Sequence, residues 1–300
     1  MINKRTKPFC WKKIFHILNI LILSLFSLAV ILPILNIIAL SLNGGKDAAM
    51  GGVYFWPRVF TLDNYKAVFN DNRIITGYKI TILRTVIGTV SSIFLTAMAA
   101  FALKSRTLPG RRVITFLIFF TMLFSGGTIP YYMLLRNTGL LNTFWVYVIP
   151  SLYSTWNIIM MRTFFEGISI SLEESAKLDG CNDFTVFIKI ILPLSKPVIA
   201  VIALFNGVAH WNDWFTGAYF VTNADLHPVQ TILQEMLTTQ AKLKELMSDS
   251  YQSAQFAKRA VTGESLKMAT IVVSTLPIVL VYPFIQKYFA KGVMIGAIKE

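Results

Sequence analysis

The chain has 300 residues, of which 55% are hydrophobic and only 14% are charged. A soluble domain of this length would carry roughly 25% charged residues, so we expect long stretches that never meet water. The net charge of +13 would suggest a nucleic-acid partner for a soluble protein. No basic run with interleaved aromatic residues lies outside the apolar segments, so nucleic acid is not expected. The basic residues instead flank expected membrane spans.

Six apolar stretches are long enough to cross a bilayer, which takes about 20 residues. The first, 14–42, follows a basic leader at 1–13. Its apolar part is too long for a signal peptide, and no convincing small-residue cleavage site follows, so we expect an uncleaved span. The other five form a core at 78–290, and a tail follows at 291–300. Their expected bounds are 78–103, 112–135, 143–165, 196–221 and 267–290. The predicted fold class is all-α, a polytopic membrane protein with six transmembrane helices.

Lysine and arginine in the loops predict the orientation. The leader is strongly basic, the turn at 104–112 carries four basic residues and no acidic one, and the tail is basic too. With six spans these segments share one side, which is therefore predicted to be cytoplasmic, together with the loop at 166–195. The segments 43–77 and 222–266 are mixed in sign and are predicted to be extracellular.

The two extracellular segments differ in character. Segment 43–77 contains several glycines and predicts turns with a short interfacial helix. Segment 222–266 is polar, with a helical middle from about Val229 to Lys258. It is either a lid or docking element or a solvated connector.

Cysteine and histidine predict neither a metal site nor a disulfide. Cys10 and Cys181 both fall on the expected cytoplasmic side, where thiols stay reduced. His16, His210 and His227 are scattered along the chain. No cofactor is therefore expected for this chain.

The cytoplasmic loop predicts a first short helix. Ser171 and Glu174 have the spacing of a capping box, which predicts that the helix begins at Leu172. Gly180 suits the left-handed position that ends a helix.

A second short helix is expected after this glycine. Asn182 is suited to cap it, and Pro193 is expected to stop or bend it. Four apolar side chains recur at helical spacing and predict one apolar face: Phe184, Phe187, Ile188 and Ile191.

Two helices joined by a glycine turn would form a rigid knob on the cytoplasmic surface. Its first helix carries Glu173, Glu174 and Asp179, so it is suited to dock into a groove of a soluble partner. The alternative is a solvated amphipathic connector, which local sequence alone favours.

The loop resembles the EAA motif of the permeases of ABC importers. The motif's core corresponds to Glu174-Ser175-Ala176, its acid–glycine pair to Asp179-Gly180, and its downstream pair to Leu192-Pro193. Ser175 replaces the middle alanine, which exchanges one small residue for another. In that family this element is the coupling helix seated in the ATPase subunit. The resemblance implies a coupling role for Glu173, Glu174, Ser175, Ala176, Asp179, Gly180 and Pro193.

Nearly the whole chain resembles carbohydrate-uptake permeases, and most of all those for complex oligosaccharides in Gram-positive bacteria. The similar stretches are 124–132, 139–143, 210–214, 282–284 and 291–297. The resemblance implies translocation of a carbohydrate, with an oligosaccharide favoured, and the alternative is another small solute of the same superfamily. It also implies a homologous second permease subunit, a dimer of ATPase subunits and an extracellular sugar-binding lipoprotein as partners, in a bacterial plasma membrane. The chain has no phosphate-binding loop, so ATP is expected to bind to the partner subunits.

The fifth span carries polar residues that are expensive at membrane depth and therefore usually face a cavity or a partner. Asn206, His210 and Asp213 have the spacing of one helical face. Sugar contact would suit these groups, since aromatic rings stack on sugars and amides bind hydroxyls. The alternative, slightly favoured, is hydrogen bonding to a neighbouring helix. The candidates for the substrate path are Asn206, His210, Trp211, Asn212, Asp213 and Trp214.

The third span contains residues that interrupt a helix. Gly126-Gly127 and Pro130 predict a break in the third span.

An intramembrane enzyme would need an acid–base pair. His210 and Asp213 are the candidates, and no further residue joins them. A lone channel or a scaffold would leave the cytoplasmic loop without a purpose. We therefore expect a transport subunit that is not itself an enzyme.

Overall fold

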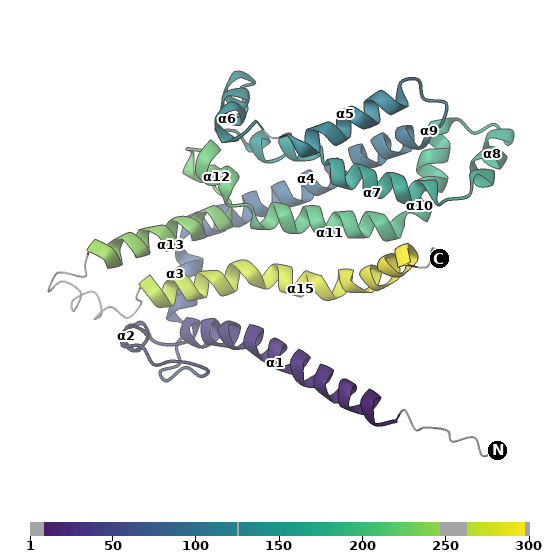
Figure 1. Ribbon diagram of the computed structural model, residues 1–300. Coiled ribbons are helices and arrows are strands. Elements are labelled where there is room, and N and C mark those ends of the chain that lie inside the picture. Colours follow the sequence, from purple (N-terminus) through teal and green to yellow (C-terminus); the bar gives the residue numbers. More distant parts are fainter. Residues whose placement is uncertain (1–8, 125, 247–262, 298–300) are drawn as a thin grey trace, which may run out of the picture. The chain divides into compact units, whose positions relative to one another are not determined.

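The computed structural model describes residues 9–124, 126–246 and 263–297 (Figure 1). This described part is helical, and its β structure is an isolated bridge between Asn43 and Phe60, which confirms the all-α prediction. The chain divides into two compact units. One comprises residues 1–70 and 236–273, and the other comprises residues 71–235 and 274–300.

The first unit begins with α1 (Phe9–Ser41), a helix that is apolar along almost its whole length. Residues 12–41 have a mean hydropathy of 2.6 in their most apolar window, and none of that window is buried by the protein. A helix that is apolar all round and not covered by protein is typical of a membrane span. Apart from Leu42, which follows the helix, the predicted first span at 14–42 lies within α1.

Short helices α2 (Gly45–Ala49) and α3 (Asp63–Asn70) follow in the same unit. The buried amide of Asn64 donates hydrogen bonds to the carbonyl oxygens of Ser41 and Asn43, both at 2.9 Å. It thereby ties α3 to the end of α1. The predicted turns with a short helix in this segment are confirmed.

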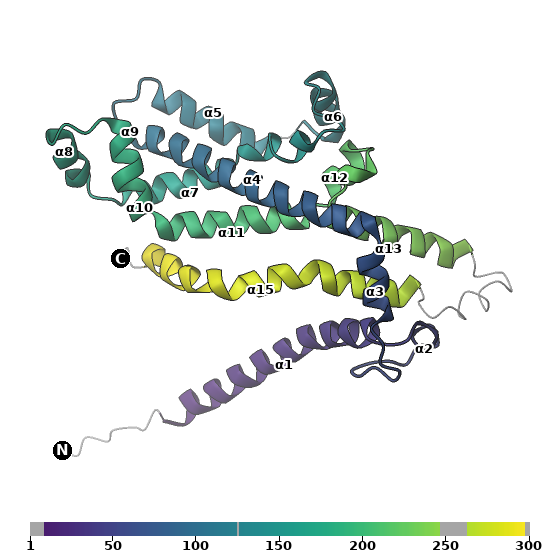
Figure 2. The ribbon, with the colours of Figure 1, turned by 180° about the vertical axis from the view of Figure 1, so that it is seen from behind.

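The second unit is built around α4 (Asn72–Lys104), which packs against α7 (Thr155–Glu166) and α11 (Lys196–Asn212) (Figures 1 and 2). Asp71 caps α4 by accepting a hydrogen bond from the backbone of Arg73. Small residues recur along the buried side of α4, which lets neighbouring helices approach closely. They are Gly77, Thr81, Gly88, Ser92 and Thr96.

The third apolar stretch is broken, as predicted. It forms α5 (Arg111–Leu123) and α6 (Thr128–Asn137), which are bent by 119°. Gly127 has a φ of +83°, a conformation that glycine adopts without steric cost. Pro130 lies in the first turn of α6, where its missing N–H costs no helical hydrogen bond.

The expected continuous helix at 143–165 is wrong. Its first part forms two 3₁₀ turns, η1 (Phe144–Tyr147) and η2 (Pro150–Leu152), and α7 begins only at Thr155. Pro150 cannot donate within a helix, and the Ser154 hydroxyl starts α7 by accepting from the backbone of Asn157. With 12 residues, α7 is about 18 Å long, shorter than the bilayer core.

The expected helix at 196–221 is also not continuous. α11 ends at Asn212, and α12 (Phe215–Phe220) follows after a break. The carboxylate of Asp213 accepts a hydrogen bond of 3.0 Å from the backbone N–H of Thr216. Asp213 therefore ends one helix and starts the next, a role that helical periodicity does not reveal.

Two longer helices complete the chain. They are α13 (Val229–Leu246) and α15 (Gly263–Ala297). The predicted helix from Val229 is confirmed up to Leu246, and its remainder lies outside the described residues. The predicted sixth span at 267–290 lies within α15.

The number of spans stays a prediction. Among the described residues, three helices are long and apolar enough to cross a membrane, or up to five if each bent pair counts as one span. The bent pairs are α5 with α6, and residues 183–194 with α11.

Candidate functional site: a helical knob and a pocket at a helix break

The first helix of the 166–195 loop is α8 (Ile170–Leu178), which begins two residues before the predicted start. The predicted capping box is wrong. Ser169 holds the cap position, and the Ser171 hydroxyl pairs with the Ser169 hydroxyl at 2.8 Å. Ser171 already lies within the helix, so it cannot adopt the extended backbone that a capping residue needs.

The glycine turn is confirmed. Gly180 has a φ of +83°, and the backbone N–H of Cys181 donates to the carbonyl oxygen of Ala176 at 2.9 Å. This is the hydrogen bond by which a left-handed glycine closes the end of a helix. Any residue with a Cβ would be strained at position 180.

The second helix begins at the predicted cap, since the Asn182 side chain accepts a hydrogen bond from the backbone N–H of Thr185 at 2.8 Å. It runs through α9 (Asp183–Val186), a π-helical turn η3 (Phe187–Ile191) and α10 (Leu192–Leu194). The chain then bends by 80° into α11. Pro193 therefore lies next to the predicted bend.

The predicted apolar face of this second helix divides into two parts. Phe187 and Ile191 are buried in the main core of the second unit, next to Phe165 of α7. Phe184 is 60% exposed, although its ring lies beside that of Phe187, and Ile188 is partly exposed. The side with Phe187 and Ile191 therefore anchors the knob to the bundle, and the side with Phe184 is accessible to solvent.

The acidic residues of the first helix are not equivalent. Glu173 forms a largely buried ion pair with Lys104 at the end of α4, so it attaches the helix to the bundle. Glu174 and Asp179 are exposed. Beside them Leu178, at the last position of α8, is 89% exposed. The knob thus presents an exposed large apolar side chain on the same short helix end as two exposed carboxylates.

An ion pair spans the glycine turn. The Lys177 ammonium lies 2.7 Å from the carboxylate of Asp183, and this hydrogen bond raises the pKa of Lys177. Both side chains are largely exposed, so we expect the pair to contribute little to stability.

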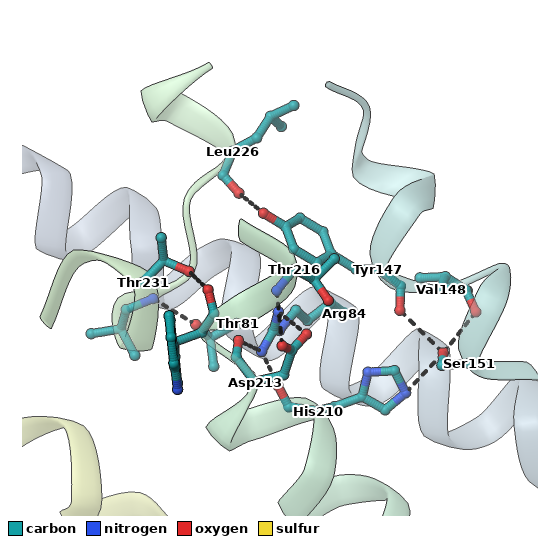
Figure 3. Close-up of polar contacts among 12 residues, drawn as sticks. Thr81, Arg84, Tyr147, Val148, Ser151, His210, Asp213, Thr216, Leu226 and Thr231 are labelled. Carbon is teal, nitrogen blue, oxygen red and sulfur yellow. Dashed lines mark hydrogen bonds and ion pairs between the residues drawn. The ribbon is translucent and has the colours of Figure 1, made fainter. Parts of the chain in front are cut away.

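The second candidate region lies where α11 ends, and a buried arginine occupies it. The Arg84 side chain, from α4, has no solvent exposure, and its Nη1 lies 3.3 Å from a carboxylate oxygen of Asp213. Its Nη2 donates to the carbonyl oxygens of His210 and Asp213. The Tyr147 ring lies 4.9 Å from the guanidinium carbon (Figure 3).

This arrangement follows from the chemistry of a helix end. The last carbonyl groups of a helix have no partner within it and carry partial negative charge. Arg84 supplies both hydrogen-bond donors and positive charge at that point, next to the Asp213 carboxylate. The guanidinium thus closes the end of α11 inside the bundle.

Interhelical hydrogen bonding, the alternative for the fifth span, is present. Asn206 accepts from the Asn157 amide of α7 at 2.9 Å and donates to the Ser92 hydroxyl of α4 at 3.1 Å. His210 Nε2 lies 3.3 Å from the Ser151 hydroxyl (Figure 3).

These same residues also line a pocket of about 300 Å³. Asn206, His210 and Asp213 lie on its wall, so the two interpretations of the fifth span are compatible. Its other lining residues are Tyr131, Val146, Tyr147, Pro150, Ser151, Ala209 and Thr216. Tyrosine rings, hydroxyls, an amide and a carboxylate therefore converge on one cavity.

The other three residues predicted for the substrate path lie outside this pocket. Trp211 is buried and donates its indole N–H to the carbonyl oxygen of Ser274 at 2.9 Å. Asn212 is exposed, and Trp214 packs its ring against Phe215. None of the three lines the pocket.

His210 and Asp213, the candidate acid–base pair of an intramembrane enzyme, contact different groups and not each other's side chains. The Asp213 carboxylate contacts Arg84 and the backbone of Thr216, while the His210 imidazole contacts Ser151.

Arg84, Tyr131 and Tyr147 belong to this site but were not among the residues predicted for it. Arg84 carries a signal, since it is a charged residue inside a mostly apolar stretch, whose other charge, Lys79, lies near its start. Tyr131 follows the predicted break at Gly126-Gly127. Tyr147 lies in the stretch expected to be a plain span, and nothing in the sequence marks it.

The helical architecture, the long apolar helices and the helix–glycine turn–helix knob are typical of a membrane protein of the transporter class. A family profile for "Binding-protein-dependent transport system inner membrane component" matches residues 74–295. The chain belongs to this family and is a permease subunit of an ABC importer.

Individual relatives agree over nearly the full length. The chain is 38% identical to the polygalacturonan/rhamnogalacturonan transport system permease protein YtcP of Bacillus subtilis, over 96% of this chain and 99% of the relative. It is 40% identical to the protein LplC of the same organism, over 96% and 95%. Among solved structures, a bacterial ABC transporter involved in the import of the acidic polysaccharide alginate matches with a TM-score of 0.85 and 33% identity, over 94% of this chain and 100% of that one.

Proposed function

We propose that this permease moves an oligosaccharide, delivered by an extracellular binding protein, across the bacterial plasma membrane. Its relatives include a permease named for polygalacturonan and rhamnogalacturonan and a transporter of alginate. These names favour a fragment of a polysaccharide of this kind as the substrate. Both termini and the knob lie in the cytoplasm, in accordance with the basic loops.

The knob is the coupling element, and the exposed apolar side chains of Leu178 and Phe184 carry this proposal. Large apolar side chains on a rigid, partly acidic knob would be unfavourable in water and are typical of an interface. A groove of an ATPase subunit receives them. Closure of the ATPase dimer then pushes on α8 and, through the buried contacts of Phe187 and Ile191, on the bundle.

Such a push selects between two states of the importer, an inward-open and an outward-open one. A homologous second permease subunit completes the translocation path. The pocket at the end of α11 contributes sugar contacts to that path. Its tyrosine rings stack on sugar faces, and Asn206 and Asp213 hydrogen-bond to hydroxyls.

The test is ATP-dependent uptake of a labelled oligogalacturonide by cells that carry the intact importer. Deleting Gly180, or changing Asp179→Lys, is expected to abolish uptake while the chain stays in the membrane. Thr222→Ala, at an exposed position on the opposite side of the predicted membrane, is the control and is expected to preserve uptake. Normal uptake after both changes in the knob would refute the coupling role.

A further inference from the structure

A second pocket lies in the same unit, between the first turns of α5 and the last turns of α7. Its volume is about 470 Å³. Its lining residues are Arg111, Arg112, Thr115, Phe116, Phe119 and Arg162. Neither the coupling knob nor the pocket at the end of α11 shares any of these residues.

This pocket has an excess of positive charge. Glu166 neutralises part of it, with Arg111 Nη2 at 2.9 Å and Arg162 Nε at 3.0 Å from the same carboxylate oxygen. Arg112 is exposed and has no ion pair within the part of the chain that the structure describes. Two guanidinium groups therefore share one carboxylate and a third has none among the described residues, so the pocket keeps a net positive charge that suits an anion.

The pocket continues into an apolar strip along α5. Arg112, Phe116 and Phe119 share one helical face. Phe116 is 65% exposed, and α5 contains no fully buried residue among those described. A basic mouth followed by exposed phenylalanines matches an amphiphile with an anionic head and an apolar tail.

We propose that this pocket binds the headgroup of an anionic phospholipid of the cytoplasmic leaflet. Arg111, Arg112 and Arg162 hold the phosphate, and the acyl chains lie along Phe116 and Phe119. This placement rests on the orientation proposed above, in which the turn at 104–112 faces the cytoplasm. An acidic protein partner fits less well, because Phe116 and Phe119 lie one and two turns further into the span, where a soluble subunit does not reach.

The experiment uses the assembled importer, purified in detergent and reconstituted in nanodiscs of either phosphatidylglycerol or phosphatidylcholine. Native mass spectrometry and lipid titration measure how tightly each lipid is retained. The variants are Arg112→Gln and the double change Arg112→Gln with Arg162→Gln. Arg106→Gln is the matched control, because Arg106 is exposed on the same basic turn but does not line the pocket.

The wild type is expected to retain phosphatidylglycerol in preference to phosphatidylcholine. Each arginine removed is expected to weaken this retention about fivefold, since a basic residue near an anionic surface contributes about 1 kcal/mol. Arg106→Gln is expected to change it by less than about twofold, because its removal affects only the screened surface potential.

Three results would overturn the proposal. Equal losses with Arg106→Gln and Arg112→Gln would show a non-specific charge effect. Full competition by inorganic phosphate alone would show a simple anion site. Loss of the ATPase subunit on Arg112→Gln, with lipid retention unchanged, would show a protein contact. Lipid retention is measured without transport, so a failure of uptake in the wild type would count against the proposed function and not against this site.

Discussion

The Nη1 atom of Arg84 lies 3.3 Å from the carboxylate of Asp213, 129 residues further along the chain. This ion pair joins the middle of α4 to the break between α11 and α12. Asp213 lies on the wall of the 300 Å³ pocket, so the pair holds one wall residue of the proposed sugar path in place.

Replacing Arg84 with methionine is expected to destabilise the importer. The change leaves the Asp213 carboxylate and two carbonyl groups without their cationic partner. Loss of one member of a buried pair costs about 3–5 kcal/mol, and we expect the lower end because the Asp213 side chain is 32% exposed. The measurement is the thermal unfolding midpoint of the purified importer.

Thr85→Val is the matched control for this change. The Thr85 hydroxyl is buried and has no hydrogen-bond partner in the described structure, so an apolar side chain of the same shape should be neutral or slightly stabilising. A Thr85→Val variant as unstable as Arg84→Met would indicate that the surface of α4, and not the ion pair, determines stability.

Gly88→Ala tests the close approach of α4 and α11. A Cβ atom at position 88 would collide with the His210 imidazole, and such overpacking costs about 1–3 kcal/mol. Adding His210→Ala should recover part of that loss in a double-mutant cycle of unfolding free energies. At Gly207 a Cβ would meet only the Thr89 hydroxyl at 3.9 Å, so Gly207→Ala is expected to be tolerated. Independent, additive effects of Gly88→Ala and His210→Ala would contradict the contact.

Two phenylalanines represent the two sides of the knob: Phe184 is on the exposed side and Phe187 on the buried side. Phe184→Ser is expected to leave the chain folded but to weaken its association with the ATPase subunit, because Phe184 is exposed. Phe187→Ser is expected to destabilise the fold by about 3–5 kcal/mol, the usual cost of removing a buried phenylalanine. Co-purification of the ATPase subunit and the unfolding midpoint, measured together, distinguish the two effects. Equal behaviour of both variants would argue against a two-sided knob.

Tyr131 provides a test of sugar contact in the pocket. Tyr131→Ala is expected to raise the half-saturating substrate concentration of uptake severalfold, since it removes a stacking surface, while Tyr131→Phe keeps the ring and should have a small effect. Tyr132 is the neighbouring control, because its side chain does not line the pocket. Equal effects of Tyr131→Ala and Tyr132→Ala would contradict a specific role for the pocket.

The helical class, the first span, the break at Gly126-Gly127 and the turn at Gly180 could be predicted because each depends on local chemistry. Hydrophobic length determines a span, and a left-handed turn favours glycine. The division of the apolar face at Phe184 and Phe187 could not be predicted, because it depends on which neighbours pack against it.

The breaks in the fourth and fifth stretches were missed for a similar reason. Apolar residues lie on both sides of Pro150 and of Asp213, so both stretches were expected to be single helices, although polar residues interrupt the fifth one at 210–213. At Asp213 the break is stabilised by Arg84, and such a long-range partner is not visible in local periodicity. The placement of His210 and Asp213 on one helical face was therefore only partly informative, because Asp213 lies just beyond the end of α11.

Nucleotide-dependent cross-linking between the knob and the ATPase subunit tests the central claim most directly. In a chain with Cys10 and Cys181 changed to serine, a cysteine is introduced by Leu178→Cys or, as a control on the opposite side, by Ala224→Cys. The account predicts that Leu178→Cys cross-links to the ATPase subunit with a yield that changes on ATP binding, and that Ala224→Cys does not cross-link to it. Cross-linking through Ala224→Cys, or none through Leu178→Cys in an importer that is active in uptake, would contradict the account.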